Sequence, residues 1–129
     1  MPERKWNMSD PVAVVRAYFD AVAAGDPSAV GALFAPDAEL HNAAGTLRGA
    51  EAITRMYEGG LRTGAMKPSP GPLVVDGEQV AVEIDLNADG KPMKLGDFFT
   101  VREGKIHRLA IYSLNPVNPK FFDAAEDNS

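Results

Sequence analysis

One carboxylic acid occupies a position where the sequence otherwise places apolar side chains. Alternate residues of the predicted strand 92–102 share one face, and these are Met93, Leu95, Asp97, Phe99 and Val101. An unpaired carboxylate is costly to bury, so such a group stays protonated or finds partners, and a protonated acid can donate a hydrogen bond. A second interpretation stays open, because a slip of one residue at Gly96 would turn Asp97 to the surface.

A tyrosine on the first predicted helix is the second candidate. Tyr18 lies at helical spacing from Val14 and Val22, so its ring belongs to an apolar stripe. A buried tyrosine hydroxyl usually finds a hydrogen-bond partner. The sequence therefore allows two interpretations, a core tyrosine with a satisfied hydroxyl or a donor that faces a site.

Three helices are predicted to precede most of the strands. An N-cap followed by proline begins one helix at Asp10-Pro11 and the next at Asp26-Pro27. The first ends at Gly25, the second at Pro36-Asp37, and a third follows Gly49.

Alternating apolar residues predict a short strand after the second helix and a meander at the end. The predicted strands span residues 38–42, 73–75, 79–86, 92–102 and 105–113, and the Gly- and Pro-rich segment 63–72 is predicted to be a loop. In the first of them, Leu40 and Asn42 share one face while Glu39 and His41 share the other. Helices followed by antiparallel strands indicate an α+β fold.

Composition narrows the classes of function. The length of 129 residues suits a single domain, 1–129, with a loose arm at 1–9 and a tail at 115–129. The chain has no cysteine, its net charge is -5, and no run of Lys or Arg offers a basic face, so we expect no nucleic-acid partner. Its apolar stretches are too short to span a membrane or to form a signal peptide, which is compatible with a cytoplasmic location.

Several stretches together resemble one known family. They are residues 18–26, 34–42, 48–57 and 97–101, within a similarity that extends over about 10–118. These stretches resemble bacterial ketosteroid isomerases (steroid delta-isomerases), within the nuclear transport factor 2-like or SnoaL-like superfamily. The resemblance implies a cone-shaped roll, in which a curved, mixed but mostly antiparallel sheet wraps around three N-terminal helices.

The resemblance also implies roles for the two candidates. Tyr18 and Asp97 match the tyrosine and the protonated aspartic acid that donate hydrogen bonds to the substrate carbonyl oxygen and stabilise the dienolate. Ketosteroid isomerase is itself the standard example of an acid kept neutral by apolar surroundings. Tyr57 matches a further tyrosine that supports this network.

Asn42 departs from the family, whose general base is an aspartate at this position. An amide cannot accept and return a proton, and general-base catalysis typically contributes roughly 10²–10⁴-fold. Four explanations stay open: an engineered variant, a homologue whose base lies elsewhere, different chemistry, or ligand binding alone. Glu39 and His41 are the nearest titratable groups, and alternation places both on the opposite face, although a twist at the end of the strand could re-aim His41.

Limonene-epoxide hydrolases also resemble this region, because they carry an asparagine near position 42 that helps to hold the attacking water. Their Asp-Arg-Asp set is mostly missing here. Asp85 can stand for one aspartate, but Glu83 and Ile111 occupy the places of the other two residues.

Three hypotheses follow from these residues. The chain is an isomerase-like enzyme for an unsaturated ketone, a non-catalytic binder of an apolar ligand, or a hydrolase, cyclase or dehydratase of secondary metabolism. Each uses an apolar pocket for a steroid, terpenoid or polyketide-like ring, needs no cofactor or metal, and is compatible with a homodimer through the outer sheet face. The predicted ligand-contacting residues are Val22, Phe34, Leu40, Met56, Tyr57 and Phe99.

Overall fold

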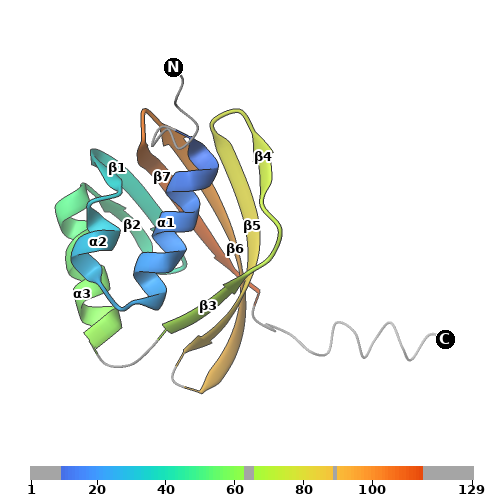
Figure 1. The fold of residues 1–129 in the computed structure, drawn as a ribbon. Helices are drawn as coiled ribbons and strands as arrows, with labels where there is room; N and C mark the ends of the chain where they lie inside the picture. The colour runs from blue at the N-terminus through green and yellow to red at the C-terminus, as the bar shows by residue number, and fades with distance from the viewer. Residues whose placement is uncertain (1–9, 63–65, 89, 115–129) are drawn as a thin grey trace.

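The computed structural model describes residues 10–62, 66–88 and 90–114, which form three helices and seven strands (Figure 1). The predicted arm and tail lie outside these ranges. The helices are α1 (Pro11–Ala23), α2 (Pro27–Gly31) and α3 (Ala50–Arg62). The strands are β1 (Phe34–Asn42), β2 (Gly45–Arg48), β3 (Met66–Pro70), β4 (Val74–Asp76), β5 (Gln79–Ala88), β6 (Lys91–Arg102) and β7 (Lys105–Ser113).

Both predicted helix starts are confirmed at the level of hydrogen bonds. The side chain of Asp10 accepts from the backbone N–H of Val12 at 3.1 Å, and that of Asp26 accepts from Ala29 at 3.1 Å. These bonds satisfy amide groups that have no partner within the helix. Gly25 follows α1 with φ of 68°, a conformation that glycine adopts without strain, so the chain turns directly into α2.

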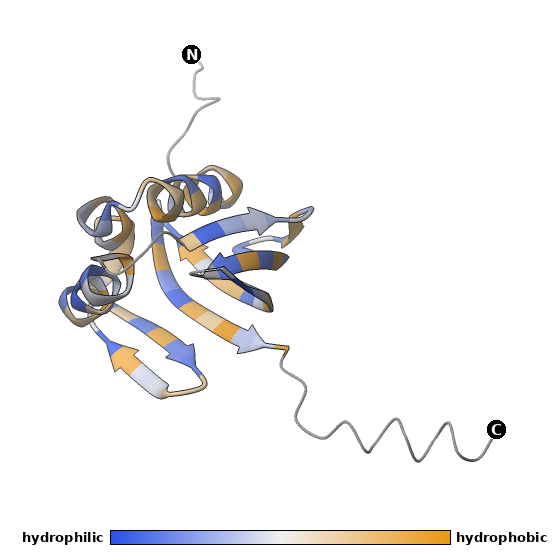
Figure 2. Cartoon of the chain, turned by 90° about the horizontal axis from the view of Figure 1, so that it is seen from below, coloured by the Kyte–Doolittle hydropathy of each residue, from blue (hydrophilic) through white to orange (hydrophobic). Residues whose placement is uncertain are grey.

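The predicted fold class is confirmed. The sheet order is β2-β1-β7-β6-β5-β3, with β4 on the same edge of β5 as β3. The β1–β7 pair is parallel and the other pairs are antiparallel. The sheet is curved, and the helices lie together on one side of it (Figures 1 and 2).

Four predictions along the chain were wrong, and proline accounts for the two that concern β1 and β3. The second helix ends at Gly31 rather than at Pro36-Asp37, and β1 begins at Phe34, with a register shift before Glu39 that accommodates Pro36. The segment 66–70 was predicted to be a loop but forms β3, and strand β2 was not predicted. Proline is tolerated at bulges and on edge strands because its missing N–H breaks no ladder bond there.

The core lies between the helices and the concave face of the sheet. Its fully buried side chains include Val14, Leu40, Ile53, Phe99 and Leu109. Figure 2 shows hydrophobic and hydrophilic residues alternating along the strands, as expected for a sheet with one covered face. Within the described ranges, no helix has the length and apolar run needed to cross a bilayer.

Candidate active site

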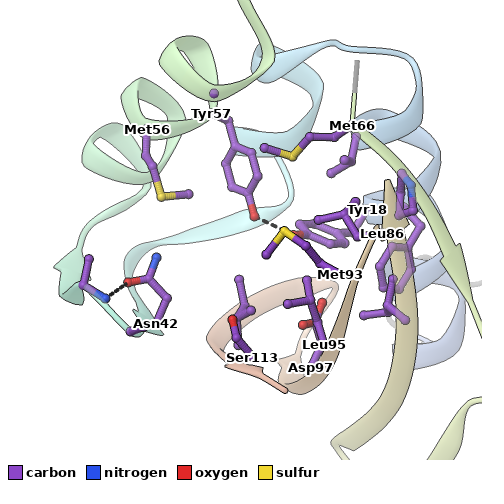
Figure 3. Close-up of a pocket in the computed structure, with 18 residues that line it drawn as sticks. Tyr18, Asn42, Met56, Tyr57, Met66, Leu86, Met93, Leu95, Asp97 and Ser113 are labelled. Atoms are coloured by element: carbon purple, nitrogen blue, oxygen red, sulfur yellow. Dashed lines mark hydrogen bonds between the residues drawn. The ribbon is translucent and has the colours of Figure 1, made fainter. Parts of the chain in front are cut away.

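A cavity of about 420 Å³ opens between the helices and the concave face of the sheet (Figure 3). It lies within the size range of small-molecule sites. Most of its wall is apolar, and its polar side chains are Tyr18, Asn42, Tyr57, Asp97 and Ser113. The first tyrosine comes from α1, the second from α3, and the remaining three from strands β1, β6 and β7.

Asp97 faces this cavity from the centre of β6. The register with β5 and β7 is continuous from Leu95 to Thr100, so no slip occurs at Gly96. The side chain is 3% exposed, and within the described part of the chain its buried Oδ1 has no hydrogen-bond partner. Burial raises the pKa of Asp97 from 3.8 to about 7. A large fraction of the group is therefore protonated near neutral pH.

The two tyrosines form a short hydrogen bond with each other. The Tyr18 and Tyr57 hydroxyl oxygens are 2.5 Å apart, and both rings are buried. The Tyr18 ring also contacts Phe19 and Phe99 edge to face, with centroids 5.1 and 5.3 Å away, which fixes its direction. Burial is the main cause that raises the pKa of each tyrosine, and the negative charge of Asp97 adds to both. Both hydroxyls therefore keep their protons.

Asn42 reaches the cavity from the end of β1. Its Oδ1 accepts a hydrogen bond from the backbone N–H of Ala44 at 2.9 Å, which closes the turn into β2. Figure 3 shows this bond on one side of the amide and the amide nitrogen on the other, toward Met56. The side chain is half-buried, whereas Asp97 and the tyrosines lie deeper.

His41 is turned away from the cavity, as strand alternation predicted. Its Nε2 lies 3.0 Å from Glu39 Oε1, and its Nδ1 lies 3.0 Å from Thr46 Oγ1, on the outer face of the sheet. Arg48 also pairs with Glu39. The hydrogen bond with His41 is the largest of the causes that lower the pKa of Glu39. This network joins β1 to β2 and supplies no base to the cavity.

The carboxylates of β5 are also outside the cavity. Asp85 is exposed and pairs with Lys94 at 3.1 Å, and Glu83 is exposed on the same face. Ile111, which the resemblance to epoxide hydrolases matched to their second aspartate, lines the cavity. No group of three metal-ligating side chains lies together anywhere in the described ranges.

Comparison with known proteins places this chain in a family. A model described as "SnoaL-like domain" matches residues 15–109. The chain belongs to the SnoaL-like domain family. A steroid delta-isomerase of Nocardioides simplex is 49% identical over 47 residues, a match that covers 35% of this chain and 38% of that protein. The chain therefore matches well under two thirds of that curated relative.

Solved structures resemble this SnoaL-like domain over more of its length. A proposed polyketide cyclase from Sinorhizobium meliloti has a TM-score of 0.70 at 31% identity and covers 76% of this chain and 92% of its own. A proposed ketosteroid isomerase from Kribbella flavida has a TM-score of 0.74 at 20% identity, covering 84% and 81%. An NTF2-like protein of unknown function from Cytophaga hutchinsonii has a TM-score of 0.73 at 17% identity, covering 88% and 94%. The two structures below 25% identity support the fold alone.

The structure gathers most of the candidate residues of the SnoaL-like domain around one cavity. Tyr18, Asn42, Tyr57 and Asp97 all line it, together with Val22 and Met56. In contrast, Phe34, Leu40 and Phe99 are buried in the core and are absent from the cavity wall. Their burial was predictable from periodicity, but periodicity does not distinguish a core side chain from one that borders a void.

Sequence reasoning missed one wall of the cavity. Met66 and Pro68 lie on β3, which was predicted to be a loop, and Ala43 and Ala44 form the turn after β1. Leu86 and Met93 also line the cavity, and their apolar alternation on β5 and β6 was the signal that could have found them.

Proposed function

We propose that this SnoaL-like protein binds an apolar ring ketone, or its enol, and stabilises the enolate with hydrogen bonds from Tyr18 and Asp97. One observation carries the proposal: a buried carboxylic acid with an unpartnered oxygen shares an apolar cavity with a buried tyrosine pair. A polar group buried without a partner is rare and needs an explanation, and a ligand oxygen would supply that partner.

The tyrosine pair is suited to donate toward a ligand. Each hydroxyl has one proton, so if Tyr57 donates to Tyr18, the proton of Tyr18 is free for a ligand oxygen. A protonated Asp97 supplies a second donor. Fixed donors aimed at a developing oxyanion in an apolar site stabilise charge without reorganisation, which is the main electrostatic contribution in many enzymes.

Isomerisation of an unsaturated ketone also needs a group that moves a proton between carbons. Asn42 occupies the position of that base and cannot ionise in the required range. The chain would then have the hydrogen-bond donors that stabilise the enolate, and the rate of proton transfer would be limited because position 42 has no base. The partial similarity to a steroid delta-isomerase supports the reaction class.

A second function is favoured by the ionisation of Asp97. A group whose pKa is about 7 can accept a proton and return it. Among the described residues that line the cavity, Asp97 alone has a carboxyl group. In a ring-closing aldol step, Asp97 would take a proton from the carbon between two carbonyls. That carbon would bond to a third carbonyl carbon, and Asp97 would return the proton to the new alkoxide. Similarity to a proposed polyketide cyclase supports this alternative.

A steroid assay tests the first function. We expect that a Δ5-3-ketosteroid is converted slowly or not at all by the unsubstituted chain and at least about 10²-fold faster by Asn42→Asp, followed by conjugated-enone absorbance. The double variant Asn42→Asp with Tyr18→Phe should lose most of the gain. If Asn42→Asp stays inactive although it is folded, the isomerase proposal fails and the cyclase or a pure binding role remains.

The proposal includes a homodimer through the outer face of the sheet. Phe98 and Tyr112 are 49% and 60% exposed and contact each other edge to face, and Leu114, which is 71% exposed, borders the same surface hollow as Tyr112. Neighbouring exposed large apolar side chains commonly mark an interaction surface. A second copy of the chain would cover them.

A further inference from the structure

The orientation of the Asn42 amide is fixed by the turn that it closes. The backbone N–H of Ala44 needs an acceptor, and Oδ1 supplies it at 2.9 Å, so the nitrogen must take the other direction. That direction leads toward Met56 and the cavity (Figure 3). Among the described residues, none accepts a hydrogen bond from this NH2 group. Asn42 therefore directs its NH2 donors to the cavity and its oxygen to the turn (Figure 3).

The turn by itself does not require asparagine. Only the side-chain oxygen takes part in the bond to Ala44, and an aspartate would provide the same oxygen. The two residues differ in the atom that faces the cavity, which is an NH2 donor in asparagine and a carboxylate oxygen in aspartate. A choice between asparagine and aspartate at position 42 therefore changes the interaction with a ligand and leaves the bond to the backbone the same.

We infer that Asn42 is a specificity-determining residue that donates a hydrogen bond to a second oxygen of the ligand. Tyr18 and Asp97 hold the first oxygen deep in the cavity, and Asn42 lies nearer the rim on another wall. The wall between these groups is largely apolar, so the ligand is a ring system with oxygen on at least two positions. This favours a polyoxygenated, polyketide-like substrate over a ring with a single ketone.

This inference rests on the proposed function, because the first oxygen must bind at Tyr18 and Asp97. It adds that the ligand's second oxygen accepts a hydrogen bond. An aspartate at position 42 would reverse that preference, because its carboxylate repels an acceptor. An alanine would remove the preference without replacing it.

Methoxy-substituted naphthols test the inference, since a methoxy oxygen accepts hydrogen bonds and never donates. Affinities of 2-naphthol and of a set of positional methoxy-2-naphthol isomers are measured by ligand fluorescence at pH 6, where Asp97 is mostly protonated. The set of isomers samples different separations between the two oxygens. The readout is the ratio of the 2-naphthol Kd to the isomer Kd within each protein, which cancels general effects on the pocket.

For the chain with Asn42 we expect at least one isomer to bind roughly 3- to 10-fold more tightly than 2-naphthol, as one uncharged hydrogen bond provides. In Asn42→Ala the ratio for that isomer should fall to about one, and in Asn42→Asp below one. Asn42→Asp keeps the oxygen that binds Ala44, so it controls for damage to the turn.

Two failures can be told apart. If 2-naphthol binds and its binding weakens in Tyr18→Phe, but no isomer distinguishes the chain with Asn42 from Asn42→Ala, the role of Asn42 is refuted and the proposed function stands. If 2-naphthol does not bind, or is indifferent to Tyr18→Phe, the proposed function is refuted and the inference is refuted with it.

Discussion

Replacing Asp97 by asparagine should make the protein more stable at neutral and alkaline pH. The substitution keeps the size and shape of the side chain but removes its ability to ionise. In the folded chain Asp97 is 3% exposed, and burial raises its pKa from 3.8 to about 7. The unfolded chain leaves the same carboxyl in water, where it ionises at its ordinary pKa.

The sign and size of the effect follow from proton linkage. Between pH 4 and pH 7 the folded state holds a proton at Asp97 that the unfolded state has lost, so the free energy of unfolding falls as the pH rises. Below this range both states are protonated, and above it both are ionised. The difference between 3.8 and about 7 corresponds to a total loss of roughly 4 kcal/mol.

Urea denaturation measures this loss directly. Unfolding free energies of the natural sequence and of Asp97→Asn are compared from pH 4.5 to pH 8, and the difference cancels the titration of every other group. We expect the advantage of Asp97→Asn to grow by about 1.4 kcal/mol per pH unit between pH 5 and pH 6, by about half that per unit near pH 7, and then to level off. Asp85→Asn is the matched control, because Asp85 is exposed on the outer face of the neighbouring strand.

A difference between Asp97→Asn and the natural sequence that stays constant from pH 5 to pH 7.5 would refute the reasoning. It would mean that the carboxyl ionises in the folded chain as easily as in water. A neutral Asp97 could then not serve as a donor near pH 7, and the oxyanion role would fall with it. A similar slope in Asp85→Asn would show instead that the slope does not come from burial of Asp97.

Three further results are expected. The affinity for 2-methoxynaphthalene, whose oxygen accepts and never donates, should fall as the pH rises above 7 and Asp97 stops donating, and fluorescence titration of Asp97→Asn should show no such fall. Gly31→Ala should lower the unfolding free energy by roughly 1–3 kcal/mol, because the added carbon would lie 1.9 Å from Thr54 Oγ1, and Thr54→Ala should restore part of it in urea denaturation. Phe98→Asp should convert a dimer to a monomer in sedimentation velocity, whereas a natural sequence that sediments as a monomer at high concentration would contradict the dimer.

Most of the fold could be predicted from the types of residues that are neighbours in the sequence. The N-caps at Asp10 and Asp26 and the last two strands needed only information from neighbouring residues, and the structure confirms them. The errors arose where the outcome depends on pairing with distant strands. Proline at Pro36 and Pro68 indicates a break when it is considered alone, but a bulge in β1 and the free edge of β3 accommodate it.

The candidate site was predictable only in part, for a related reason. The apolar alternation around Asp97 and the resemblance at Tyr18 and Asn42 pointed to residues that do line one cavity. Which apolar residues surround them depends on the curvature of the sheet, which decides that Met66 borders the void while Phe34 is covered by the core. The direction of the Asn42 amide depends in addition on its hydrogen bond with the backbone of Ala44, which the sequence does not reveal.

The two functions proposed for the cavity require opposite protonation states of Asp97. As a donor to an enolate, Asp97 must be neutral, so the rate should fall as the pH rises above about 7. As the base of a ring closure, it must first be ionised, so the rate should rise over the same range and then level off. Tyr18 and Tyr57 keep their protons throughout, because burial raises the pKa of both, and Asn42 does not ionise at all. The direction of the pH–rate profile near neutrality therefore reports the state of one carboxyl and distinguishes an isomerase-like from a cyclase-like mechanism once any substrate is turned over.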